Sequence, residues 1–68
     1  MTILYTILFN KQNIKLDDAI KWVNNNGYKI YKVDESATQY KIRLNEKLKN
    51  KRYITKVLSK TIRLVVAN

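Results

Sequence analysis

The hydrophobic positions along the chain follow two different periods. Residues 2–9, TILYTILF, are apolar at nearly every position and rich in β-branched and aromatic side chains, as in a strand covered on both faces. In residues 15–26, KLDDAIKWVNNN, Leu16, Ala19, Ile20 and Val23 recur at helical spacing. The pattern therefore predicts a central strand followed by an amphipathic helix.

The ends of this helix carry their own signals. Asp17 and Asp18 fall in its first turn, where a carboxylate complements the helix dipole. Gly27 is the only glycine of the chain and directly follows the last periodic residues, which is typical of a C-cap with positive φ. Trp22, at the edge of the apolar stripe, is expected to anchor the helix to a sheet.

Alternating segments then predict four further strands. Residues 28–33 (YKIYKV) and 39–44 (QYKIRL) flank the turn DESA, and residues 52–58 and 61–67 flank Ser59 and Lys60. Within 39–44, Tyr40 and Ile42 share one face, and Lys41 and Arg43 share the other. The prediction is an α+β fold, one small domain over residues 1–68, in the order β-α-β-β-β-β with one helix on an antiparallel sheet.

The amino-acid composition argues against several kinds of catalytic and metal site. The chain has 68 residues with no Cys and no His, which argues against a disulfide, a structural zinc site, a thiolate nucleophile and a histidine base. We expect a non-enzyme without metal or cofactor and without a small-molecule substrate. A domain of this size buries only about 60% of its unfolded surface, so self-association or a larger assembly would help to stabilise it.

Charge is distributed unevenly. Residues 1–38 carry five Lys against four acids, a balance of +1, whereas residues 39–68 carry six Lys and three Arg against Glu46, a balance of +8. Such an asymmetry points to a polyanionic partner. The cations expected to contact phosphates are Lys41, Arg43, Lys49, Lys51, Arg52, Lys56, Lys60 and Arg63.

The expected arrangement is a ladder of cations across neighbouring strands, with Lys41, Arg43, Arg52, Lys56 and Lys60 on one face. Ile54 and Leu58 fall on the same side of their strand as Lys56, which suggests a bulge or a second buried surface in a dimer. The alternative is that these cations form only the solvated face of the sheet.

The five tyrosines divide into two groups. Tyr5, Tyr28 and Tyr40 are expected to fill the core beneath the helix. Tyr31 and Tyr53 are flanked by cations and are the candidates for an exposed platform that stacks unpaired bases.

The order of these features resembles a small domain of phage and prophage proteins of the XkdF type and of large DNA viruses. The matching residues are Ala19, Trp22, Gly27 and Tyr28, then Val33, Asp34 and Glu35, then Tyr40, Lys41 and Arg43, and last Val65 and Val66. The chain departs from that pattern at Lys15, Lys41 and Asn68. The resemblance implies a viral or phage context, an α/β fold and a non-catalytic module.

These observations predict a protein that binds nucleic acid, DNA rather than RNA, through the phosphate backbone and with little sequence specificity. The alternative is a protein-interaction module of a capsid or virion assembly, with a homo-oligomer as one form. Electrostatic association with anionic membrane surfaces is a third option that lacks a basic amphipathic helix. No apolar run has the roughly 20 residues of a membrane span, so we expect an intracellular or virion protein that is not secreted.

Overall fold

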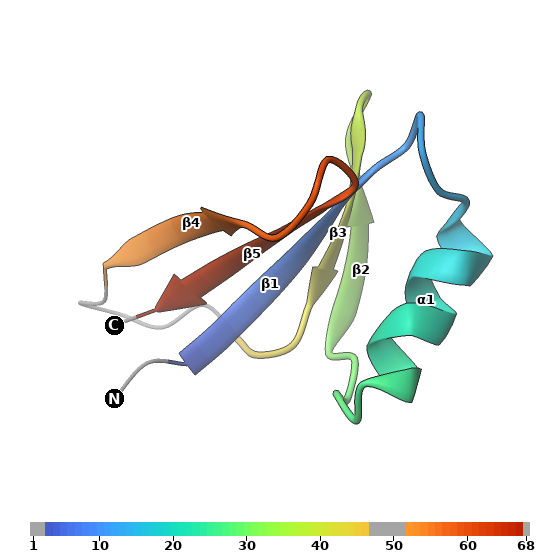
Figure 1. Ribbon diagram of the computed structural model, residues 1–68. Coiled ribbons are helices and arrows are strands. Elements are labelled where there is room, and N and C mark those ends of the chain that lie inside the picture. Colours follow the sequence, from blue (N-terminus) through green and yellow to red (C-terminus); the bar gives the residue numbers. More distant parts are fainter. Residues whose placement is uncertain (1–2, 47–51, 68) are drawn as a thin grey trace.

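The computed structural model describes residues 3–46 and 52–67, and these form one helix and five strands. The elements are β1 (Ile3–Asn10), α1 (Leu16–Asn25), β2 (Lys32–Glu35), β3 (Gln39–Arg43), β4 (Tyr53–Val57) and β5 (Ile62–Ala67). The strands form a single antiparallel sheet in the order β2-β3-β1-β5-β4 (Figure 1). The predicted α+β fold and its element order are confirmed.

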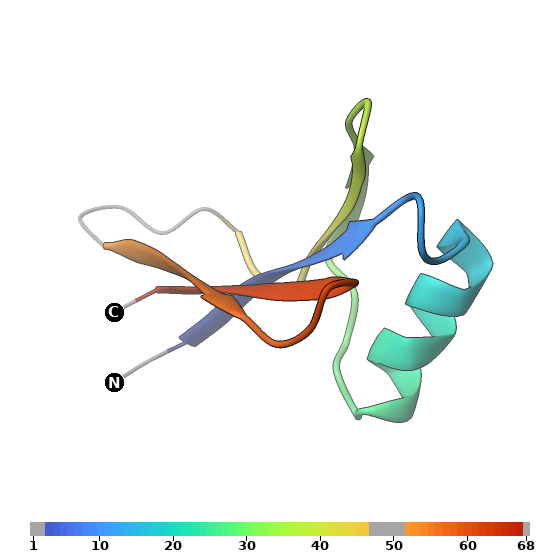
Figure 2. The same ribbon diagram turned by 45° about the horizontal axis from the view of Figure 1, so that its top comes forward.

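The core lies between α1 and one face of the sheet. Ile7, Phe9 and Ile42 project from the sheet and are fully buried, as are Ala19 and Val23 of α1. The Trp22 ring meets Phe9 edge to face, with 5.8 Å between centroids, and so acts as the predicted anchor. Figures 1 and 2 show α1 beside the half of the sheet that holds β2 and β3, with β4 at the far edge.

The end of α1 is set by Gly27, which has a φ of 81°. The Tyr28 N–H donates to the Val23 carbonyl at 3.2 Å, and the Gly27 N–H donates to the Asn24 carbonyl at 3.0 Å. This pair of hydrogen bonds is the Schellman motif, which requires a residue in the left-handed region. The predicted glycine cap is confirmed.

The two hairpins are closed by serine hydroxyls. Ser36 Oγ accepts from the Gln39 N–H at 3.1 Å, and Ser59 Oγ accepts from the N–H groups of Thr61 and Ile62 at 3.2 and 3.1 Å. These side chains satisfy turn donors locally, so the hairpins form without a glycine. The strand predicted over residues 28–33 is shorter and lies later in the chain. β2 begins at Lys32, because the backbone at Tyr28 is still bonded to the end of α1. It continues to Glu35, so Asp34 and Glu35 belong to the strand and not to the predicted turn.

In the described part of the chain, no helix has the length and apolarity needed to cross a membrane.

Candidate nucleic-acid interface

The sheet face turned away from α1 carries no helix among the described residues, and we call it the open face (Figure 2). Its members follow from the register, because residues opposite each other in antiparallel strands share a face. Leu8 of β1 lies between Lys41 of β3 and Arg63 of β5. Thr6 lies between Arg43 of β3 and Val65 of β5. The open face therefore alternates cations with apolar and hydroxyl side chains.

A β-bulge adds an aromatic pair to this face. The register with β5 pairs Leu4 with Val66 and Thr6 with Val65, so Tyr5 is an extra residue in β1. Such a bulge re-aims a side chain that strict alternation would place on the core side. The Tyr5 ring lies 4.8 Å from the ring of Tyr53, whose strand partner Ala67 also belongs to the open face. Tyr5 and Tyr53 thus form an aromatic pair at one end of the open face.

Arg43 is held in place by Asp34. Its Nε and Nη2 donate to Asp34 Oδ2 at 3.2 and 3.0 Å, and Lys32 Nζ lies 3.8 Å from Asp34 Oδ1. Hydrogen bonding to Asp34 raises the pKa of Arg43 further, with a smaller contribution from Tyr5. The guanidinium is therefore a fixed cation beside the aromatic pair, and Asp34 is the acid that partly offsets the charge of this face.

A shallow groove runs along the open face. It is lined by Tyr5, Thr6, Leu8, Asp34, Glu35, Gln39, Lys41, Arg43 and Val65. Thr6 is only 5% exposed, and its Oγ1 has no hydrogen-bond partner among the described residues. The groove thus combines charged walls with a polar atom in its floor.

The predicted site residues do not all come together. Lys41, Arg43, Arg63 and Tyr53 share the open face. Lys56 does not, which corrects the predicted ladder: it lies opposite Leu64, and Leu64 lies opposite the core residue Ile7. Lys56 and Ile54 therefore face the α1 side of the sheet. Of the predicted cations on the open face, Lys41 and Arg43 of β3 are separated from Arg63 of β5 by β1. Lys32 of β2, which was not among the predicted residues, lies directly opposite Arg43.

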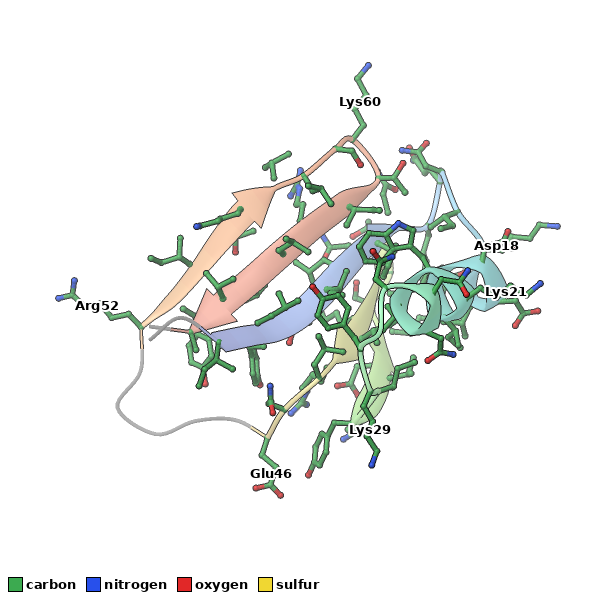
Figure 3. All side chains as sticks on the ribbon, turned by 60° about the horizontal axis from the view of Figure 1, so that its bottom comes forward. Asp18, Lys21, Lys29, Glu46, Arg52 and Lys60 are labelled. Carbon is green, nitrogen blue, oxygen red and sulfur yellow. The ribbon has the colours of Figure 1, made fainter. Side chains whose placement is uncertain are left out.

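The other residues predicted to bind nucleic acid lie at the edges of the sheet or outside the described residues. Arg52 and Lys60 extend from opposite ends of the β4 segment, away from the sheet (Figure 3). Lys49 and Lys51 lie outside the described residues. Tyr31 precedes β2, at the opposite edge of the sheet from Tyr53, and its hydroxyl donates to Glu46 Oε1 at 3.1 Å. That hydrogen bond raises the pKa of Tyr31, and the adjacent carboxylate makes Tyr31 a poor neighbour for a phosphate.

The expected core tyrosines are only partly where they were predicted. Tyr40 packs against the core, as expected. Tyr28 is 40% exposed, and Tyr5 lies on the open face. Tyr5 could not be predicted on the open face, because the bulge has no signal in the residues around it. Lys32 lies within the strand predicted over residues 28–33, but its place on the open face depends on the pairing of β2 with β3.

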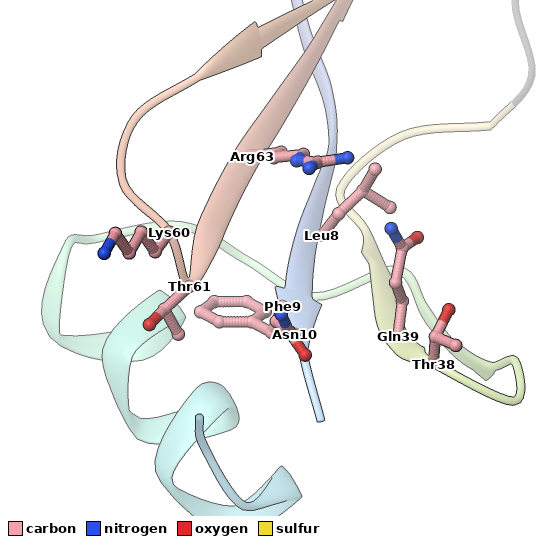
Figure 4. A pocket seen from close by; sticks show the side chains of 8 residues that line it. All are labelled: Leu8, Phe9, Asn10, Thr38, Gln39, Lys60, Thr61 and Arg63. Atoms are coloured by element: carbon pink, nitrogen blue, oxygen red, sulfur yellow. The ribbon is translucent and has the colours of Figure 1, made fainter. Parts of the chain in front are cut away.

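A smaller depression of about 160 Å³ lies at the end of the sheet near the β4–β5 turn (Figure 4). Arg63 and Lys60 point in opposite directions there, with Arg63 toward Leu8 and Gln39. This volume is below the roughly 300 Å³ at which small-molecule sites begin.

Among the described residues, no group of three acidic, His or Cys side chains is placed to hold a metal ion, and Asp34 is engaged by Arg43 and Lys32.

No family of known sequences, no curated protein and no solved structure matches this chain. The resemblance to the XkdF-type phage domain consequently rests on its short sequence motifs and stays a prediction.

Proposed function

We propose that this protein binds nucleic acid across the open face, with single-stranded DNA as its first candidate ligand. The observation that carries this proposal is the placement of the Tyr5–Tyr53 pair on the same helix-free face as Lys41, Arg43 and Arg63. Single-strand binders combine these two elements: cations that track the phosphates and aromatic rings on which bases stack.

The shape of the face favours an unpaired strand. The shallow groove runs over the surface of the sheet, where splayed bases and their backbone have room to lie flat. The one helix of the described residues lies on the opposite side and carries Lys21 with Asp17 and Asp18, so it offers no basic helix for a duplex major groove. Contacts to phosphates and ring faces carry little base information, so binding is expected to be weakly sequence-selective.

Fluorescence anisotropy with a labelled random single strand and a labelled random duplex, each over a range of salt concentrations, tests the proposal. For a single strand, log affinity falls against log salt with a slope of about −0.7 for each phosphate neutralised. We expect tighter binding of the single strand than of the duplex. The double variant Lys41→Gln/Arg63→Gln is expected to make the salt slope shallower by about 1.4, because two phosphate contacts are lost.

The matched control is Lys21→Gln/Lys29→Gln. It removes the same total charge, but Lys21 lies on α1 and Lys29 follows it, away from the open face (Figure 3). A response confined to the open-face variant supports the proposal. Equal losses in both variants would show that only net charge matters, and an unchanged slope in both would place the contacts elsewhere.

A further inference from the structure

The outer strand β4 and the residue that follows it carry the most exposed large aliphatic side chains of the described residues. Ile54, Val57 and Leu58 are 47%, 71% and 57% exposed. β4 ends the sheet on one side, and β2 ends it on the other. Edge strands are usually protected by charge, as β2 is by the sequence KVDE, whereas β4 reads YITKV with a single cation. An edge of this kind is suited to pairing with another strand.

The direction of the backbone groups of β4 follows from its hydrogen bonds to β5. The Leu58 N–H donates to the Ile62 carbonyl at 3.0 Å. In an antiparallel pair, hydrogen-bonded residues recur at every second position. Lys56 and Ile54 therefore bond to β5, and the N–H and C=O groups of Thr55 and Val57 point outward from the sheet.

We propose that two copies of this chain pair through β4, antiparallel, about a two-fold axis at Thr55. Because this axis is perpendicular to the sheet, each residue lies on the same face of the joint sheet in both copies. Residues opposite each other must share a face, so other registers can differ from this one only by an even number of residues. The register centred on Thr55 pairs all five residues of β4 with those of the second copy. It also brings the outward backbone groups of Thr55 opposite each other.

Repulsion between cations of the two copies also favours the register centred on Thr55. With Thr55 opposite Thr55, Lys56 faces Ile54 of the second copy, and its alkyl stem covers that apolar side chain. A shift of two residues in one direction places Lys56 opposite Arg52 of the second copy. The same shift in the other direction places Lys56 opposite Lys56. Like charges directly opposite destabilise a strand pair, so full overlap and charge agree on one arrangement.

This arrangement makes a continuous sheet of ten strands with both open faces on the same side. It does not depend on nucleic-acid binding. The remaining charges of the two copies repel each other, and salt screens that repulsion with a Debye length of about 8 Å at physiological strength. Dimerisation is therefore expected to strengthen as salt rises, in the opposite direction to phosphate binding.

Sedimentation equilibrium of the full chain tests the proposal. The expected mass of the wild type at concentrations of roughly 100 μM is twice the chain mass of 8.1 kDa. Thr55→Pro removes only an outward N–H and leaves the ladder to β5 intact, so this variant is expected to stay folded and to have the mass of one chain. Thr55→Val, which keeps the N–H, is the control and is expected to remain dimeric. A monomeric wild type, or a dimer that survives Thr55→Pro, would overturn the proposal.

Cysteine cross-linking tests the register. The chain has no Cys, so Thr55→Cys introduces the only thiol. Opposed Cα atoms of an antiparallel pair lie about 4.5–5.5 Å apart, within the range of a disulfide. Two thiols lose two electrons and two protons to an added oxidant such as oxidised glutathione and form one S–S bond. Rapid formation of covalent dimer by Thr55→Cys, and slow formation by Lys60→Cys, is expected. Equal rates would reject this register.

Discussion

The rings of Tyr5 and Tyr53 lie 4.8 Å apart although β5 separates their strands. Two features allow this contact. The bulge in β1 turns Tyr5 onto the open face, and Ala67, the partner of Tyr53 in β5, has too small a side chain to keep the rings apart. Ala67 is fully buried even though its side of the sheet has no helix among the described residues. The tyrosine pair therefore covers part of the sheet that would otherwise face water.

Replacing either tyrosine of the pair tests base stacking. Tyr5→Ala or Tyr53→Ala is expected to weaken single-strand binding by about 1–3 kcal/mol, whereas Tyr53→Phe keeps the ring and is expected to bind like the wild type. Anisotropy titrations give these affinities. Tyr28→Ala removes an exposed tyrosine that follows α1 and serves as the control. Equal losses for Tyr28→Ala and Tyr53→Ala would argue against a specific platform.

Removing the acid of the open face tests the role of Arg43. In Asp34→Asn the guanidinium loses its ion pair and becomes available to a phosphate. We expect tighter single-strand binding and a salt slope steeper by up to ~0.7. The partly exposed ion pair contributes little to stability, so the melting temperature is expected to change little. Asp18→Asn, which removes an acid of α1 outside the open-face groove, is the charge-matched control. Weaker binding by Asp34→Asn would show that Asp34 positions Arg43 for the ligand.

The Tyr31–Glu46 hydrogen bond predicts a dependence on alkaline pH. The pKa of Tyr31 is raised chiefly by this bond, so the phenol holds its proton more tightly in the folded chain than in the unfolded one. The contact therefore stabilises the fold below about pH 10, and this contribution is lost as pH rises through the folded pKa. Glu46→Gln is expected to lower the pKa of Tyr31, measured by NMR titration of the tyrosine rings. An unchanged pKa would mean that the bond does not form in solution.

The buried hydroxyl of Thr6 predicts a stabilising substitution. Thr6→Val keeps the shape of the side chain and removes a polar atom without a partner among the described residues. We expect the free energy of unfolding to rise by about 1 kcal/mol, measured in urea. Thr6→Ser keeps the hydroxyl and loses a methyl group, which is expected to cost about 0.8 kcal/mol. A less stable Thr6→Val would indicate that a water molecule satisfies the hydroxyl.

Replacing Gly27 is expected to lower the free energy of unfolding through the backbone conformation alone. A Cβ at this position would meet no heavy atom within 4 Å, so the positive φ is the only obstacle to a side chain. Gly27→Ala is expected to lower the free energy of unfolding by about 1–2 kcal/mol. Gly27→Asn is expected to cost less, because Asn tolerates this region of φ and ψ better than Ala. Equal stability of the Ala variant and the wild type would contradict the assigned cap.

The elements of this fold are local properties of the sequence, and that is why they could be predicted. The stripe of Ala19 and Val23 identifies the helix, and Gly27 identifies its end, because both signals depend on neighbours within one or two turns. The alternation of Lys41 and Ile42 likewise gives the two faces of β3 correctly.

The arrangement of the site depends on pairings between distant residues and could not be predicted. Lys56 is assigned to a face only once β4 is paired with β5 and β5 with β1. Tyr5 changes face because of a single extra residue opposite Val65. Both outcomes follow from tertiary register, which leaves no mark on the sequence near either residue.

The strand order also sets the path by which the domain folds. β1, the first strand in the chain, pairs with β5, the last, so the centre of the sheet is completed only by contacts between residues near opposite ends of the sequence. Contacts of such large sequence separation slow folding, because the intervening loop must close before they form. During synthesis, β1, which contains Ile7 and Phe9, lacks its partner on one side until β5 (Ile62–Ala67) has left the ribosome. The most buried strand of the native sheet is thus the strand that is made first and completed last, and its exposed apolar side chains favour aggregation of the nascent chain.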